Sequence, residues 1–129
     1  MPCDDASVGW LIIDSRAPRS LADGAYARRR AECEQALAGL RRAGNDVDSL
    51  RDATVEMIDA ADLGEPVARR ARHVVTEIAR VVEGSAALAG GRFEQFGRLM
   101  HQSHASLVRD FEVSIDALDF IAARSAEHD

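Results

Sequence analysis

Two histidines and two serines lie within six residues of one stretch. His101, Ser103, His104 and Ser106 belong to residues 97–119, GRLMHQSHASLVRDFEVSIDALD. A serine beside a histidine suggests nucleophilic catalysis, but neighbours on a helix point about 100° apart, so Ser103 and His104 cannot pair by themselves. Two imidazoles one turn apart can share a metal ion, yet no third ligand stands at a suitable spacing. We therefore predict no catalytic residue and no metal site.

An amphipathic helix must position this stretch. Its apolar residues recur at spacings of three, four, seven and four, which places them on one helical face: Phe93, Phe96, Met100, Leu107 and Phe111. His104 falls in the middle of that face, and we interpret it as a satisfied core histidine. The pattern predicts a helix over about 92–109, then a turn and a last helix over about 115–126.

The same stretch resembles a segment of the galactokinases, members of the GHMP kinase superfamily. The family segment reads Gly-x-Leu-Met-x-x-Ser-His-x-Ser-Leu-Arg-Asp-Asp-Tyr-x-Val-Ser-x-Pro-Glu-Leu-Asp. The sequence departs from it at Val108-Arg109, Phe111 and Asp116-Ala117. The matching positions are Gly97, Leu99, Met100, Ser103, His104, Ser106, Leu107, Asp110, Val113, Ser114, Leu118 and Asp119.

Two earlier pieces extend the resemblance. Residues 70–77 are similar to the family's Arg-x-Arg-His-Val-x-x-Glu, and Leu21 to Cys33 are similar to its Leu-x-x-x-x-Tyr-x-x-Arg-Arg-x-x-Cys. In galactokinases this tyrosine contacts the sugar, so the resemblance implies that Tyr26 is a substrate-binding residue. Spacing alone favours a different interpretation, an amphipathic ring at the edge of a domain.

The resemblance also implies what an intact enzyme would do. It would phosphorylate galactose at the anomeric hydroxyl, with ATP and Mg²⁺ as cofactors. The family's serine-rich phosphate loop and terminal glycine-rich loop do not occur in this sequence. We therefore expect this chain to correspond to the helical segment in the later-middle, C-terminal half of the enzyme. It would hold no cofactor and be inactive alone, a scaffold that contributes to the sugar pocket.

The predicted fold class is mainly α, one helical domain over residues 1–129 within the GHMP kinase α+β fold. Residues 8–14, VGWLIID, are an apolar run rich in aromatic and β-branched residues, which predicts one N-terminal strand. Within the longest predicted helix, Arg70, His73 and Glu77 stand three and four apart and favour a salt-bridge ladder. About five helices are expected to pack as a bundle, at about 25–42, 50–60, 66–89, 92–109 and 115–126.

Composition limits the partners. The net charge of −6 argues against non-specific binding to nucleic acid. No apolar run approaches the roughly 20 residues that span a bilayer, and the first seven residues do not read as a signal peptide, so we expect a cytoplasmic chain and no membrane.

The predicted strand over 8–14 needs a partner, because a lone strand leaves its backbone donors and acceptors unsatisfied. One possible partner is a missing N-terminal kinase half. The other is a second copy, in which case the chain would be a non-catalytic helical interaction module derived from a GHMP kinase.

Overall fold

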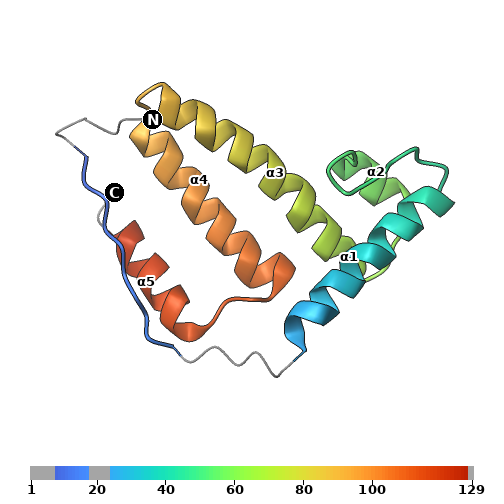
Figure 1. The fold of residues 1–129 in the computed structure, drawn as a ribbon, viewed down its shortest axis with the longest axis horizontal. Helices are drawn as coiled ribbons and strands as arrows, with labels where there is room; N and C mark the ends of the chain where they lie inside the picture. Colours follow the sequence, from blue (N-terminus) through green and yellow to red (C-terminus); the bar gives the residue numbers. More distant parts are fainter. Residues whose placement is uncertain (1–7, 18–23, 128–129) are drawn as a thin grey trace.

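The computed structural model describes residues 8–17 and 24–127. The described part of the chain is mainly helical, as predicted, with five α-helices and one π-helical turn (Figure 1). None of the helices in these two ranges is both long and apolar enough to cross a membrane. In order, the elements are α1 (Ala25–Arg42), α2 (Val55–Ala60), α3 (Val67–Ala89), α4 (Phe93–Ser106), η1 (Leu107–Phe111) and α5 (Asp116–Ala126).

Helices α3 and α4 form an antiparallel hairpin. Helix α1 packs across the N-terminal end of α3, away from the hairpin turn (Figure 1). The hairpin turn contains Gly91 at φ +66°, a left-handed conformation that glycine adopts without steric cost. The main apolar core lies where α1, α2 and α3 meet, and its fully buried side chains include Leu40, Ile58 and Ala71. This core holds the C-terminal half of α1 against α3.

The helix predicted from about residue 50 begins later, at Val55. Thr54 caps it, since its side-chain oxygen accepts a hydrogen bond from the Met57 amide at 3.3 Å. Residues before it form a turn, in which the Asp52 carboxylate accepts from the Ser49 amide at 2.9 Å. That local side-chain bond competes with helix formation, which explains the shorter element.

The helix predicted over 92–109 ends as an α-helix at Ser106 and continues as the π-helical turn η1. A π turn inserts an extra residue and shifts every later side chain around the axis. Glu112 then ends the element in the left-handed region, at φ 54° and ψ 53°. The predicted apolar face is also wrong in part before this turn: Met100 is exposed, whereas the buried residues of α4 are Leu99 and Ser106.

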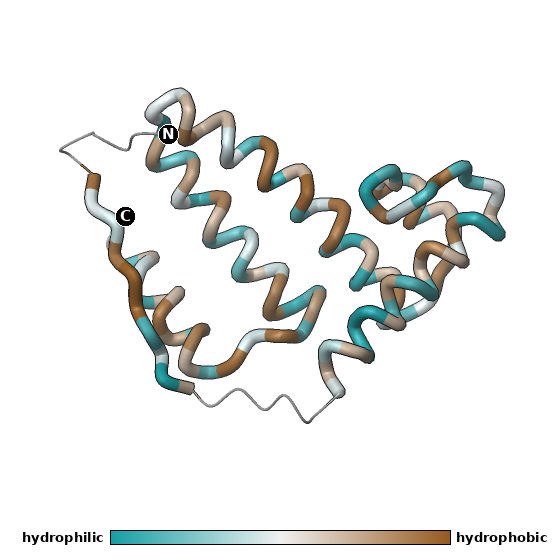
Figure 2. Tube along the Cα trace, in the orientation of Figure 1, coloured by the Kyte–Doolittle hydropathy of each residue, from teal (hydrophilic) through white to brown (hydrophobic). Residues whose placement is uncertain are grey.

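The segment 8–14 runs beside α5 as an irregular chain and is apolar in its middle (Figures 1 and 2). The predicted buried strand does not form, because no segment within residues 8–17 and 24–127 offers a strand edge to pair with it. Trp10 packs edge-on against Phe96 with ring centres 6.2 Å apart. Leu11 and Ile12 are 83% and 92% exposed, so this apolar run lies largely in solvent.

Candidate functional site

Three arginines converge on the end of η1. Arg29 comes from α1, and Arg69 and Arg70 come from α3. Together they donate to four consecutive backbone carbonyls: Arg69 to Arg109 at 2.9 Å, Arg70 to Asp110 at 2.6 Å, and Arg29 to Phe111 and, at 3.2 Å, to Glu112. The last carbonyls of a helix lack partners within it and carry partial negative charge, so guanidinium groups satisfy both needs. We call this set the arginine clamp.

Three carboxylates complete the clamp. Glu112 accepts from Arg70 at 2.6 Å and from Arg69 at 2.9 Å. Glu32 accepts from Arg70 at 2.8 Å and from Arg29 at 2.9 Å. Arg69 also pairs with Glu65 at 2.8 Å. Three positive and three negative groups therefore balance, which matters because Arg70 is only 1% exposed and a buried charge is tolerated only when paired.

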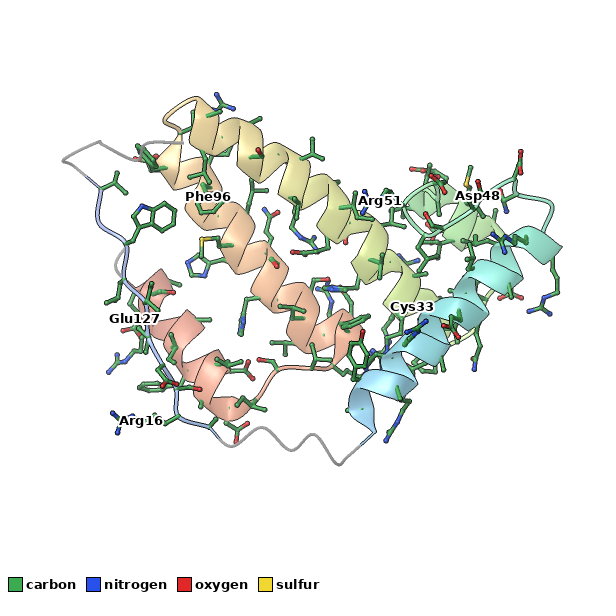
Figure 3. The ribbon with its side chains drawn as sticks, in the orientation of Figure 1. Arg16, Cys33, Asp48, Arg51, Phe96 and Glu127 are labelled. Atoms are coloured by element: carbon green, nitrogen blue, oxygen red, sulfur yellow. The ribbon has the colours of Figure 1, made fainter. Side chains whose placement is uncertain are left out.

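The clamp favours the ionised form of two carboxylates, Glu32 and Glu112. Burial raises the pKa of Glu32, but the hydrogen bonds from Arg70 and Arg29 outweigh burial and lower it overall. The hydrogen bond from Arg70 is the main cause that lowers the pKa of Glu112, with Arg69 adding to it. Cys33, on α1 one residue after Glu32, faces the same junction (Figure 3). Burial raises the pKa of its thiol, so Cys33 stays protonated there.

A second buried group lies beside the clamp. Ser106 donates to the Asp110 carboxylate at 2.9 Å, and its oxygen lies 2.9 Å from Nδ1 of His73. A hydroxyl has one proton, so while Ser106 donates to Asp110 it accepts from the N–H at Nδ1 of His73. The imidazole also stacks on Phe111, with ring centres 4.5 Å apart. The serine is thus held between acid and base and is not presented as a nucleophile.

The ladder predicted for Arg70, His73 and Glu77 is not what the structure shows. His73 and Arg70 are buried, because η1 and the end of α4 pack on this face of α3. Glu77 instead accepts from Ser103 at 2.6 Å and pairs with Arg80 at 2.7 Å. Each of the three residues therefore has a different set of partners.

His104 is not in the apolar core. Its Nε2 lies 3.1 Å from a carboxylate oxygen of Asp119, which connects α4 to α5 at a half-buried position. The two histidines of α4 do not share a cluster with a third ligand: within the residues that the structure describes, no group of three or more His, Cys, Asp or Glu side chains is placed to hold a metal ion.

Tyr26 lies in the first turn of α1 and is 82% exposed. It contributes to no part of the buried core, and its position one turn before Arg29 places it next to the clamp. The family motif includes Arg29, and Arg70 was predicted to belong to a salt-bridge ladder, but neither pattern predicts their partners in the clamp. Charge runs gave a signal at 28–30 and 69–72, but the partners that join different elements lie 38 to 83 residues apart along the chain.

Comparison with known proteins identifies the segment. No family model matches the chain. Among curated proteins, a galactokinase from a Roseiflexus species is 43% identical over 117 residues, covering 89% of this chain and 30% of that protein. The Homo sapiens galactokinase is 42% identical over 121 residues, covering 92% of this chain and 30% of that protein.

A solved structure agrees with these relatives. Lactococcus lactis galactokinase complexed with galactose superposes with a TM-score of 0.76 at 37% identity, over 82% of this chain and 28% of that one. The chain spans about 30% of the length of the curated relatives it matches. It is therefore a homologue of one helical segment of the galactokinase family.

Proposed function

We propose that this chain is a scaffold segment of a galactokinase and that Tyr26 lines its sugar pocket. In the intact enzyme, a cytoplasmic kinase, the γ-phosphoryl group of ATP would pass to the anomeric hydroxyl of galactose with the help of Mg²⁺. The observation that carries this proposal is the likeness, with a TM-score of 0.76, to a galactokinase complexed with galactose. The exposed ring of Tyr26 supports it, since a binding residue must be accessible.

The charges of the clamp favour a scaffold over a catalytic part. Phosphoryl transfer depends on cations that hold the phosphates and the developing charge. Arg29, Arg69 and Arg70 already donate to carboxylates and carbonyls, so none of the three is available to bind ATP without breaking the clamp. ATP and Mg²⁺ would therefore bind to the remainder of the enzyme, and we propose that this chain alone is inactive.

A chimera tests the role of Tyr26. The chain would replace the matching residues of Lactococcus lactis galactokinase, with and without Tyr26→Phe. Loss of one hydroxyl hydrogen bond to the sugar should raise the KM for galactose about tenfold and leave the KM for ATP unchanged. Equal KM values for galactose in the two chimeras would contradict the role. A coupled ATP assay on the chain alone should show no galactose-dependent turnover.

A second candidate function rests on the exposed apolar run. Residues 11–13 are exposed, and segment 8–14 pairs with no strand among the described residues 8–17 and 24–127, which is how edge strands recruit partners. In the intact enzyme this segment would complete a sheet with the N-terminal kinase half, as the GHMP kinase fold implies. In the chain alone it would pair with a second copy, which makes the chain an interaction module.

Light scattering with size-exclusion chromatography measures this self-association. The unaltered chain should run as a dimer that dissociates on dilution, and Ile12→Lys should make it monomeric by placing charge on the strand. Val82→Lys is the matched control, because Val82 is also an exposed apolar residue but lies on α3. A monomer at every concentration, or an equal effect of both substitutions, argues against the interaction module.

A further inference from the structure

We propose that Arg29 is the positioning residue for Tyr26: by binding the end of η1, its guanidinium fixes where the sugar-binding end of α1 lies. This inference rests on the proposed role of Tyr26 in the galactose pocket. Tyr26 and Arg29 are three residues apart on α1, hence on neighbouring positions of one face and about 4.5 Å apart along the helix axis. Any contact that fixes the helix backbone at Arg29 therefore also fixes the helix backbone at Tyr26.

The first two turns of α1 have little else to hold them. Of residues 25–31, all of which the structure describes, Arg29 alone is not exposed. The first fully buried residue of the helix is Ala36, about two turns after Arg29. At the other end, Gly24 occupies the cap position at φ 61° and makes no side-chain cap hydrogen bond. Without Arg29, the end that carries Tyr26 would project from the core as an unsupported helix terminus.

All three nitrogens of the Arg29 guanidinium are used. Nε donates to the Phe111 carbonyl, one terminal nitrogen donates to the Glu112 carbonyl at 3.2 Å, and the other donates to both oxygens of Glu32 at 2.9 and 3.2 Å. A planar group held at three sites has one orientation. Glu32 is held in turn by Arg70 at 2.8 Å, so the orientation is transmitted from the buried part of the clamp.

This arrangement also defines the neighbourhood of the sugar. Because Arg29 joins α1 to the turn at Phe111 and Glu112, the turn of α1 that carries Tyr26 lies close to the end of η1. A galactose against Tyr26 would therefore lie next to this turn. The turn belongs to the stretch whose serines, histidine and aspartates match the family segment. The positioning role thus connects the two parts of the chain in which the resemblance is most specific.

The test uses the full chain with 3-fluorotyrosine in place of tyrosine, because Tyr26 is its only tyrosine and gives one fluorine signal. Arg29→Gln should speed amide exchange of residues 28–31 at least about tenfold, since it removes charge-assisted hydrogen bonds. The exchange of α3 should not change. The fluorine resonance should shift toward its position in the unfolded chain.

Two further variants keep the test decisive. Arg29→Lys retains the charge without the planar fork and should give an intermediate result, and it also serves if Arg29→Gln fails to fold. Arg28→Gln is the control, because Arg28 lies on the same stretch of α1 with an exposed side chain. It should leave both signals unchanged.

Either of two results would overturn the positioning role. One is a fluorine signal and exchange rates in the Arg29 variants that equal those of the unaltered chain. The other is faster exchange by the same factor in α3 as in α1, which would mean a general loss of stability. No sugar is present in this experiment, so its result does not depend on whether Tyr26 binds galactose. The chimera with Tyr26→Phe tests sugar binding, and the two proposals can therefore fail separately.

Discussion

Replacing Arg70 by methionine is expected to lower the free energy of unfolding by about 3 kcal/mol. Methionine fills much of the space of the arginine stem but removes the guanidinium that binds Glu32, Glu112 and the Asp110 carbonyl. Breaking a buried pair by deleting one partner typically costs 3–5 kcal/mol, because the other charge stays buried and unpaired. We expect the lower end, since the Glu112 side chain is 44% exposed and water can solvate it.

Urea unfolding followed by circular dichroism measures the change, and Arg72→Met is the matched control. Arg72 lies two residues further along α3, and its pair with Asp59 is exposed, so the same substitution there should cost less than about 1 kcal/mol. Adding Glu32→Gln to Arg70→Met should recover about 1 kcal/mol, because it restores the charge balance of the clamp, in which Glu32 still pairs with Arg29. Equal losses for Arg70→Met and Arg72→Met would show that the clamp contributes no more than a surface ion pair.

The helices were the predictable part of this fold. Apolar residues at helical spacing indicate an α-helix whatever it packs against, so helices near 25–42, 66–89 and 115–126 could be placed from the sequence. The π turn could not be predicted from the sequence, because its extra residue does not change the spacing of the apolar residues before Ser106. This turn brings Asp110 among the buried residues, whereas Met100 precedes the turn and its exposure is a separate departure from the predicted apolar face.

The candidate site was predictable only as separate pieces. The family motifs marked Tyr26, Arg29 and Arg70, but local spacing suggested a salt-bridge ladder of Arg70, His73 and Glu77. The ladder interpretation failed because a helix face cannot reveal that a second helix will cover it. Likewise, 8–14 has the composition of a buried strand, yet pairing needs an edge that the described residues lack. Long-range partners decide both outcomes, and periodicity carries no information on them.

The stability of the chain is expected to fall in two stages as the pH falls. The first stage belongs to His73. Burial lowers its pKa below the ordinary value of 6.5, although the nearby Glu77 and Asp110 carboxylates raise it and Arg80 and Arg70 lower it. The unfolded chain therefore binds a proton near pH 6.5 that the folded chain does not bind until a lower pH. The stabilisation is complete above that value and is lost as the pH falls toward the folded-state pKa.

The second stage belongs to the carboxylates. The hydrogen bond from Arg109 is the main cause that lowers the pKa of Asp110, and Arg70 has that role for Glu112. Glu32 and Glu77 are also lowered, since their hydrogen bonds outweigh burial. Their contribution is present above the ordinary pKa values of 4.5 and 3.8 and is lost as the pH falls below them, toward the lowered folded-state pKa values at which these four carboxylates become protonated.

Urea unfolding at a series of pH values separates the two stages. Each group contributes a slope of up to about 1.4 kcal/mol per pH unit, so His73 alone can account for the fall just below pH 6.5. His73→Asn should remove that first slope, because the asparagine amide can donate to Ser106 as Nδ1 does but does not titrate. The variant should keep the steeper loss below pH 4.5, which serves as its internal control. A first slope that survives in His73→Asn would assign it to another group and leave the buried hydrogen-bonded chain from His73 to Asp110 without a role in acid sensitivity.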